Sequence, residues 1–277
     1  MKGSKPKRKV VAAHVVEVPQ KAKAEDVMKA LQSFATPAKA KGSAVFFKTG
    51  KGQYGEGDIF IGVTVPEQRQ IEKAFYKNIS LPEIKKLLAS KIHEHRSVAL
   101  GILVMQMVAI KETNKDGLAE KKRIYDFYIE NRSRINNWDL VDGSVPDIVG
   151  HVLYEHDRKG MLKVLKHYAV SENMWERRIA MVATYYPILK GSTIEATTIA
   201  KMLLDDDHDL IHKASGWMLR EMGKKDKPAL IAFLDAYASR MPRTMLRYAI
   251  ERLSPEEKIK YMAIKREVTT VRKATRR

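Results

Sequence analysis

The fold of this chain is decided around the stretch Asn136-Asn137-Trp138-Asp139-Leu140-Val141-Asp142-Gly143-Ser144-Val145-Pro146. Two asparagines before an apolar-periodic run are typical of a helix N-cap, so the sequence predicts a helix with Trp138 in its first turn. Trp138 and Asp142 are then one turn apart on the same face. An aromatic face beside a carboxylate is a poor core pair but suits a positively charged ligand. The alternative is a half-buried Trp beside a solvated Asp.

Helical patterns continue on both sides of this stretch. The predicted helices cover residues 25–35, 38–47, 66–78, 81–91, 96–111, 118–131, 138–154, 159–169, 175–189, 193–204, 210–222, 228–240, 241–253 and 255–267. The more apolar ones recur at roughly 35–40 residues, near Leu100, Val141, Ala180 and Trp217, which is the period of HEAT-class helical hairpins. The breaks are short, as in antiparallel helix pairs. We therefore expect an all-α fold, a right-handed α-solenoid of HEAT-like helical hairpins.

A glycine-rich loop interrupts the helical pattern at 48–58. Gly50, Gly52 and Gly55 satisfy the G-x-G-x-x-G spacing. A dinucleotide site needs a strand before the loop and a helix opening on it. Here a predicted helix precedes the loop and a strand-like segment, 59–63, follows it. The order is inverted, so the sequence does not favour a nucleotide cofactor.

Composition limits the classes of function. The chain has 277 residues and no Cys, which excludes disulfides, thiolate nucleophiles and cysteine-ligated metal clusters. No segment reaches the roughly 18–20 apolar residues of a membrane span. The formal net charge is +18. Residues 1–23 carry +6 of it and residues 265–277 carry +5, which leaves +7 for the body between them.

This distribution suggests three parts. We expect a basic, disordered N-terminal arm at 1–22, a helical solenoid domain at 23–265 and a basic tail at 266–277. Both tails can attract phosphate without specificity, whereas the moderately basic body is the part that could shape a nucleic-acid site.

Two arginines lie near the start of one predicted helix. Arg177 and Arg178 follow Ser171 or Asn173 as the N-cap. The helix dipole and a guanidinium both favour an anion there, so the pattern suits a phosphate. The alternative is a solvated or salt-bridged pair.

Two further clusters leave alternatives open. Trp217 follows small residues and Lys213, and such a Trp either fills the core or lines a concave surface. His208 and His212 form an H-x-x-x-H pair beside an acidic run. A zincin signature needs Glu after the first His, and the residue there is Asp209, so no metal site is predicted.

Taken together, these stretches resemble the DNA alkylation repair family, the AlkD-like DNA glycosylases built from HEAT-like repeats. The matching motifs are Gly52-Gln53-Tyr54-Gly55-Glu56-Gly57-Asp58 with Gly62 and Val65-Pro66, Trp138-Asp139-Leu140-Val141-Asp142, Trp175-Glu176-Arg177-Arg178, and Gly216-Trp217-Met218-Leu219-Arg220-Glu221. Four separated motifs in the right order, spanning roughly residues 24 to 255, make the resemblance specific.

The resemblance implies a glycosylase that removes positively charged alkylated purines, such as 3-methyladenine and 7-methylguanine, from duplex DNA without extruding the base. Trp138, Asp142 and Trp217 match the family's catalytic cleft residues. The DNA-binding expectations are Arg178 as the backbone-gripping arginine, its neighbour Arg177, Tyr54 and Lys213. The expected protein is a monomer that needs no cofactor and no metal. We expect it in the cytoplasm, with the nucleoid and not with a membrane.

The chemistry fits these residues independently of the resemblance. Cleavage of an N-glycosidic bond passes through an oxocarbenium-like sugar, and a carboxylate can stabilise that charge and orient the attacking water. The electron-rich faces of Trp138 and Trp217 can also stabilise the positive charge of the sugar. A cationic purine leaves without a proton donor, so one carboxylate suffices. Two alternatives remain: a non-catalytic HEAT-like module that binds nucleic acid through charge, and a protein-binding scaffold with incidental basic tails.

Overall fold

The computed structural model describes residues 17–113 and 115–267, and the chain within these ranges is all-α. Those residues form no β-strand, only two isolated bridges. The all-α prediction is therefore confirmed. The basic arm and tail fall mostly outside the described residues. Of the part of the arm that is described, Ala22 is buried and its amide donates a hydrogen bond to the carbonyl of Asn78, so this residue packs against the helical domain.

The helices follow one another with short connections. In chain order they are α1 Ala24–Phe34, α2 Pro37–Phe46, α3 Val65–Phe75, α4 Leu81–Leu88, α5 His93–Ala109, α6 Lys115–Glu130, the 3₁₀ turn η1 Arg132–Arg134, α7 Trp138–Asp142, the π-helical turn η2 Pro146–Gly150, α8 His151–His156, α9 Met161–Ala169, α10 Met174–Val182, α11 Tyr185–Leu189, α12 Ile194–Met202, α13 Asp209–Lys225, α14 Lys227–Tyr237, α15 Arg243–Ala249 and α16 Pro255–Ala263.

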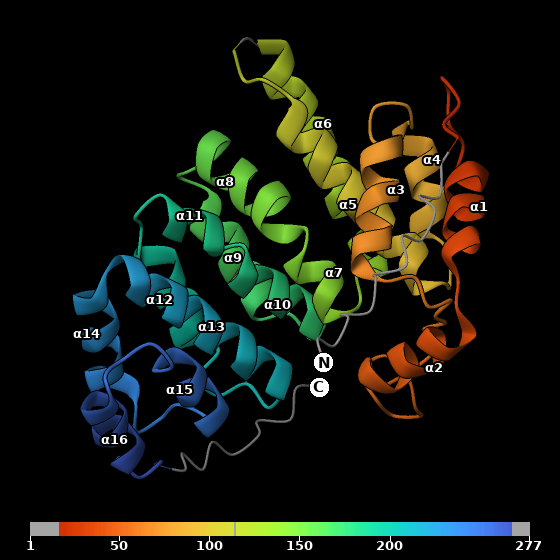
Figure 1. The fold of residues 1–277 in the computed structure, drawn as a ribbon. Coiled ribbons are helices and arrows are strands. Elements are labelled where there is room, and N and C mark those ends of the chain that lie inside the picture. Colours follow the sequence, from red (N-terminus) through yellow and green to blue (C-terminus); the bar gives the residue numbers. More distant parts are fainter. Residues whose placement is uncertain (1–16, 114, 268–277) are drawn as a thin grey trace, which may run out of the picture.

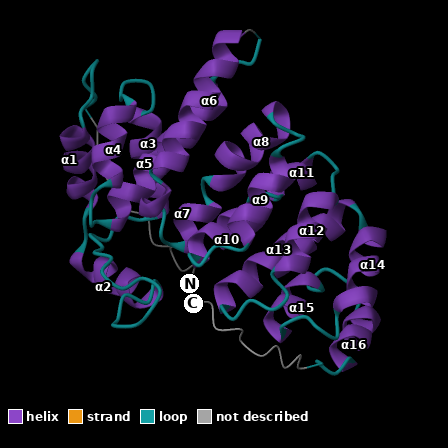
Figure 2. Cartoon of the chain, turned by 180° about the vertical axis from the view of Figure 1, so that it is seen from behind, coloured by secondary structure: helices purple, strands orange, loops and turns teal. Residues whose placement is uncertain are grey.

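The ribbon curves into an arc (Figures 1 and 2). Helices α7, α10, α13 and α15 follow the inner side of the curve, and each packs against the next. They begin at Trp138, Met174, Asp209 and Arg243, at intervals of 36, 35 and 34 residues. On the outer side lie α6, α8 and α14 (Figure 1). This repeating arrangement is compatible with the expected HEAT-like solenoid.

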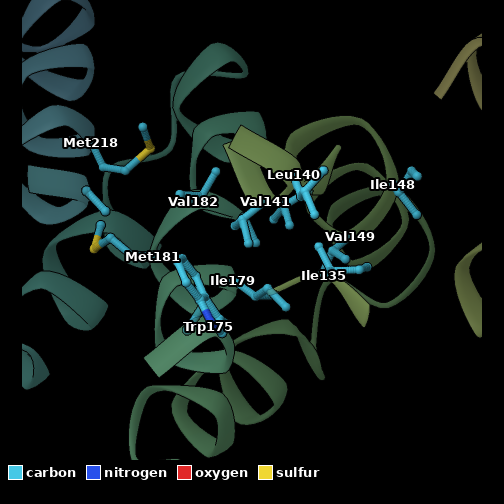
Figure 3. Close-up of a cluster of buried hydrophobic side chains, with 14 of the residues drawn as sticks. Ile135, Leu140, Val141, Ile148, Val149, Trp175, Ile179, Met181, Val182 and Met218 are labelled. Carbon is cyan, nitrogen blue, oxygen red and sulfur yellow. The ribbon is translucent and has the colours of Figure 1, made fainter. Parts of the chain in front are cut away.

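One continuous core joins the repeats and fixes the inner helices. Figure 3 shows buried side chains from α7, η2, α10 and α13 in a single cluster, among them Leu140, Val149, Ile179 and Met218. At Gly216 of α13, an added Cβ would lie 2.4 Å from the carbonyl oxygen of Met245 in α15. Only glycine permits this approach, so the motif before Trp217 serves the packing of two inner helices.

Two helices predicted as continuous are interrupted. The predicted helix 138–154 is divided into α7, η2 and α8, and 175–189 is divided into α10 and α11. Prolines are the physical reason: Pro146 and Pro187 have no N–H to donate to the carbonyls of Asp142 and Ala183 one turn earlier. The break after Asp142 makes α7 a short helix that ends at this carboxylate.

The strand-like interpretation of 59–63 was wrong. Among the described residues the segment has no strand partner, apart from a single bridge between Ile59 and Ile92, and Gly62 within it has a φ of 81°, which is outside the strand region. The amides of Ile61 and Gly62 instead donate hydrogen bonds to the Glu94 carboxylate, the latter at 2.7 Å. A side chain of α5 therefore satisfies the backbone groups that a sheet would have paired.

Candidate active site

The start of α7 is held in place by its cap. The side chain of Asn137 accepts a hydrogen bond from the amide of Trp138 at 2.8 Å, as expected for an N-cap. Its amide nitrogen donates to Asp58 Oδ2 at 3.1 Å. Arg96 donates to the side chain of Asn136 at 2.8 Å. Both asparagines of the predicted cap are thus fixed by residues from outside the helix.

Trp138 lies against an aromatic stack. Its ring stacks on Phe47 with the centroids 5.4 Å apart and the planes 17° apart. Phe47 in turn stacks on Phe60 at 4.9 Å, and the ring of Phe46 meets Trp138 edge-on at 5.9 Å. The indole is half-buried, so part of it remains open to a ligand while the stack fixes its plane.

Asp142 is held by a buried arginine. Arg178 of α10 donates from Nε to Oδ1 at 2.9 Å and from Nη2 to Oδ2 at 2.7 Å, a two-point contact that fixes the carboxylate plane. Arg178 is 4% exposed, whereas the Asp142 side chain keeps 18% exposure. Burial raises the pKa of Asp142 above its usual range; Arg178 opposes this and the nearby Asp139 charge adds to it.

The other aromatic and basic residues lie on α13 and on the glycine-rich loop. Trp217 is half-buried and packs obliquely on Tyr185 at 6.0 Å. Tyr54 meets Trp175 of α10 edge-on at 6.3 Å. The hydrogen bond to Asp209 is the main cause that raises the pKa of Lys213, and the Tyr54 phenol contributes. The loop therefore reaches across to the inner side of α10 and α13.

The family model for DNA alkylation repair enzymes matches residues 27–253 of this chain. The chain belongs to the DNA alkylation repair enzyme family. The fold is similar to that of a solved structure, a predicted DNA alkylation repair enzyme from Enterococcus faecalis, with a TM-score of 0.62, 17% sequence identity, and coverage of 80% of this chain and 97% of that one. At this identity the likeness shows the fold alone. A search of curated proteins gives no match.

Within this member of the DNA alkylation repair family, the predicted site residues form two groups. Trp138, Asp142 and Arg178 are joined through α7 and α10, as described above. Tyr54 contacts Trp175 of α10, and Lys213 of α13 pairs with Asp209 at 2.8 Å in an exposed ion pair. Trp217 lies one turn after Lys213 on α13.

Both arginines lie in surroundings that differ from those expected for a phosphate ligand. Besides its two bonds to Asp142, Arg178 donates from Nη1 to the carbonyl of Leu210. Arg177 is bound to Asp206 and to the carbonyls of Ser171 and Glu172. Each guanidinium is engaged within the protein, so a phosphate contact would require these bonds to be shared or broken.

Sequence reasoning missed a buried charged cluster beneath α7. His93 is 2% exposed and lies between two carboxylates, with Nε2 2.7 Å from Asp139 Oδ2 and Nδ1 3.2 Å from Asp58 Oδ2. Burial opposes its charge, but the bonds to Asp139 and Asp58 outweigh this and raise the pKa of His93 to about 9. The sequence signal was weak, since the partners are 35 and 46 residues away.

Among the described residues, the histidines outside this cluster form no metal centre with a free position for an ion. His208 accepts a hydrogen bond from the amide of Leu210 as an N-cap, and His212 bonds to the carbonyl of Asp206. The ligand atoms of one other group, Glu112, His151 and His156, lie within 4.8 Å of one another. The Lys121 ammonium contacts two of these three side chains, Glu112 and His151, and so occupies the place a cation would take. No helix of the described residues is long and apolar enough to cross a membrane.

Proposed function

We propose that this protein is a DNA N-glycosylase that hydrolyses the N-glycosidic bond of positively charged N-alkylated purines, such as 3-methyladenine and 7-methylguanine, in duplex DNA. The observation that carries the proposal is the Asp142 carboxylate, which Arg178 holds by a two-point contact and which stays partly exposed one helical turn after Trp138 in α7. Membership of a DNA repair family supports DNA as the substrate.

The reaction needs little beyond these groups. The bond between C1′ and the purine nitrogen breaks, and its electron pair neutralises the cationic base, which leaves without a proton donor. The sugar becomes oxocarbenium-like, and Asp142 stabilises that charge. Water then attacks C1′ and gives up a proton to Asp142 or to solvent. Trp138 and Trp217 offer indole faces to the cationic sugar and base.

The role proposed for Arg178 is twofold. Its two-point contact orients Asp142, and its charge opposes the rise in the pKa of that carboxyl caused by burial, which favours the ionised form. Contact with a backbone phosphate, also assigned to Arg178 and Arg177, would come from rearranged bonds in the DNA complex. Tyr54 and Lys213 are proposed to contact the DNA backbone from the glycine-rich loop and from α13.

The test is release of free base from methylated duplex DNA under single-turnover conditions. The wild-type protein should liberate 7-methylguanine. Asp142→Asn keeps the size of the side chain but removes its charge, and should slow release by roughly 10²–10³-fold while DNA affinity holds. A melting curve for each protein separates lost chemistry from lost folding. Wild-type protein that binds DNA without releasing base would instead indicate the non-catalytic module.

Two further measurements test the remaining parts of the proposal. DNA affinity that does not fall with salt would favour the protein-binding scaffold, because phosphate contacts release counterions. The proposal also holds that the base stays in the duplex. A 2-aminopurine placed beside the lesion should then remain quenched in the complex, and a strong rise in its fluorescence would show extrusion. The monomer state is tested by light scattering.

A further inference from the structure

His93 bears on the candidate site although it lies beneath it. Both of its ring nitrogens are within hydrogen-bond distance of carboxylate oxygens, Asp139 Oδ2 at 2.7 Å and Asp58 Oδ2 at 3.2 Å. Arg96 Nη2 also lies 3.4 Å from Nδ1, but the Asp58 oxygen is closer, and an ionised carboxylate only accepts, so we assign a proton to both nitrogens. The geometry therefore makes this ring an imidazolium with its charge placed between two acids.

The His93 ring compensates the charge of the Asp139 carboxylate. Its second oxygen, Oδ1, is buried and has no hydrogen-bond partner among the described residues. The Asp58 carboxylate differs, because Arg96 and Asn137 also bond to it. Removing the charge of His93 would leave Asp139 as an uncompensated acid three residues before Asp142 in the same short helix.

The ring also supports the aromatic stack. His93 stacks on Phe60 with centroids 4.6 Å apart and contacts Phe47 at 4.9 Å. Phe47 is the ring on which Trp138 stacks. A single buried side chain of α5 thus contacts α7 directly through the Asp139 carboxylate, and it supports Trp138 indirectly through the Phe47 ring.

We propose that His93 is a positioning residue for the candidate catalytic carboxylate: its charged ring neutralises Asp139 and fixes α7, which carries Trp138 and Asp142. This inference rests on the proposed function of Asp142. The charged and titratable groups that surround the Asp139 and Asp142 carboxylates come from the loop before α3 and from α5, α6 and α10. They are Asp58, His93, Arg96, Tyr128 and Arg178. Among them, His93 is the cation bonded to Asp139.

The electrostatic consequence can be measured. Asp139 raises the pKa of Asp142, and the charge of His93 compensates Asp139. In His93→Gln, the acid limb of the single-turnover rate profile should move to higher pH by about one pH unit, the scale of one nearby charge. In His93→Gln/Asp139→Asn both charges are absent, so the limb should return to the wild-type position or below it.

The matched control is His95→Gln. His95 is also a buried histidine of α5, but it bonds to Ser90 rather than to α7. This variant should not shift the pH profile of the single-turnover release rate, even if its melting temperature falls. Asp139→Asn alone should move the limb to lower pH, which keeps the test open if His93→Gln folds poorly.

The outcomes separate the two proposals. Wild-type protein that releases no base contradicts the proposed function. Wild-type release with an identical pH profile in His93→Gln and Asp139→Asn overturns the inference about His93 and leaves the function standing. A profile that moves in His93→Gln but is not restored in the double variant also overturns it, because the effect would then be packing rather than charge.

Discussion

Two helices on the inner side of the arc, α7 and α13, each carry a tryptophan and a partner of an ion pair, but the two ion pairs differ in burial. In the α7 region (Trp138, Asp142 and Arg178), Arg178 has a side-chain exposure of 5% and Asp142 of 18%, and the indole is stacked. In the α13 region (Asp209, Lys213 and Trp217), the side chains of Lys213 and Asp209 are 40% and 55% exposed.

The difference indicates a division of labour. A buried, two-point ion pair is fixed when the chain folds and can stabilise charge without rearranging during a reaction. An exposed Lys–Asp pair is weak and screened by salt, so its lysine can exchange the carboxylate for a phosphate at little cost. We infer that the α7 region is built for chemistry and the α13 region for adjustable contact with DNA.

The largest effect is expected for Arg178→Ala. Removing one partner of a buried ion pair leaves an uncompensated charge, so the free energy of unfolding should fall by about 3–5 kcal/mol. Base release should slow as well, because Asp142 loses its orientation and the charge that favours its ionised form. Urea unfolding and single-turnover release measure the two effects. An Arg178→Ala protein as stable as wild type would contradict the claim that the ion pair of the α7 region is buried and fixed by folding.

The second prediction concerns pH. The pKa of His93 is raised from 6.5 to about 9 in the folded protein, so its contribution to stability is fully present below pH 6.5 and is lost as pH rises through 9. The free energy of unfolding should fall by on the order of 3 kcal/mol as the pH rises from below 6.5 to above 9, at about 1.4 kcal/mol per pKa unit. His93→Gln should lack this component, and equal pH dependence of both proteins would contradict it.

The third prediction compares the two tryptophans. Trp138→Leu removes a stacked ring and should lower the free energy of unfolding by about 2 kcal/mol, whereas Trp217→Leu should cost under about 1 kcal/mol. Both should slow base release, if both indoles face the reacting sugar. Thermal melts paired with release assays measure this. The reverse order of stability would show that Trp217 belongs to the core rather than to an open inner surface.

The local sequence was sufficient to predict most helices, but it did not predict which side chains distant in the sequence form ion pairs. The Asn137 cap and the shared face of Trp138 and Asp142 follow from spacing within one turn, and the structure has the cap as predicted. The pairing of Arg178 with Asp142 spans 36 residues and that of His93 with Asp139 spans 46. Such pairs depend on how neighbouring helical repeats pack on one another, and the apolar periodicity of the sequence does not specify this packing.

The two local errors have different physical causes. The segment 59–63 has strand-like composition, but the Glu94 carboxylate, more than thirty residues away, accepts hydrogen bonds from its backbone amides. Helices 138–154 and 175–189 have continuous apolar periodicity, but Pro146 and Pro187 each remove one backbone donor. In the first case a distant partner decided the outcome; in the second, one residue outweighed the pattern.

The smallest effect is expected for Lys213→Ala, the counterpart of Arg178→Ala in the α13 region. Each substitution removes the cation of an ion pair with an aspartate, but the Arg178 pair is a buried two-point contact and the Lys213 pair is an exposed single contact. Because the Lys213–Asp209 pair is exposed, the free energy of unfolding should change by less than about 1 kcal/mol. DNA affinity should fall modestly, and the slope of log K against log salt should decrease by about 0.9, the value for one lost phosphate contact. Single-turnover release at saturating protein should persist. If the salt slope stays unchanged while the release rate falls as far as in Arg178→Ala, Lys213 acts in the chemistry and the division between the two regions is wrong.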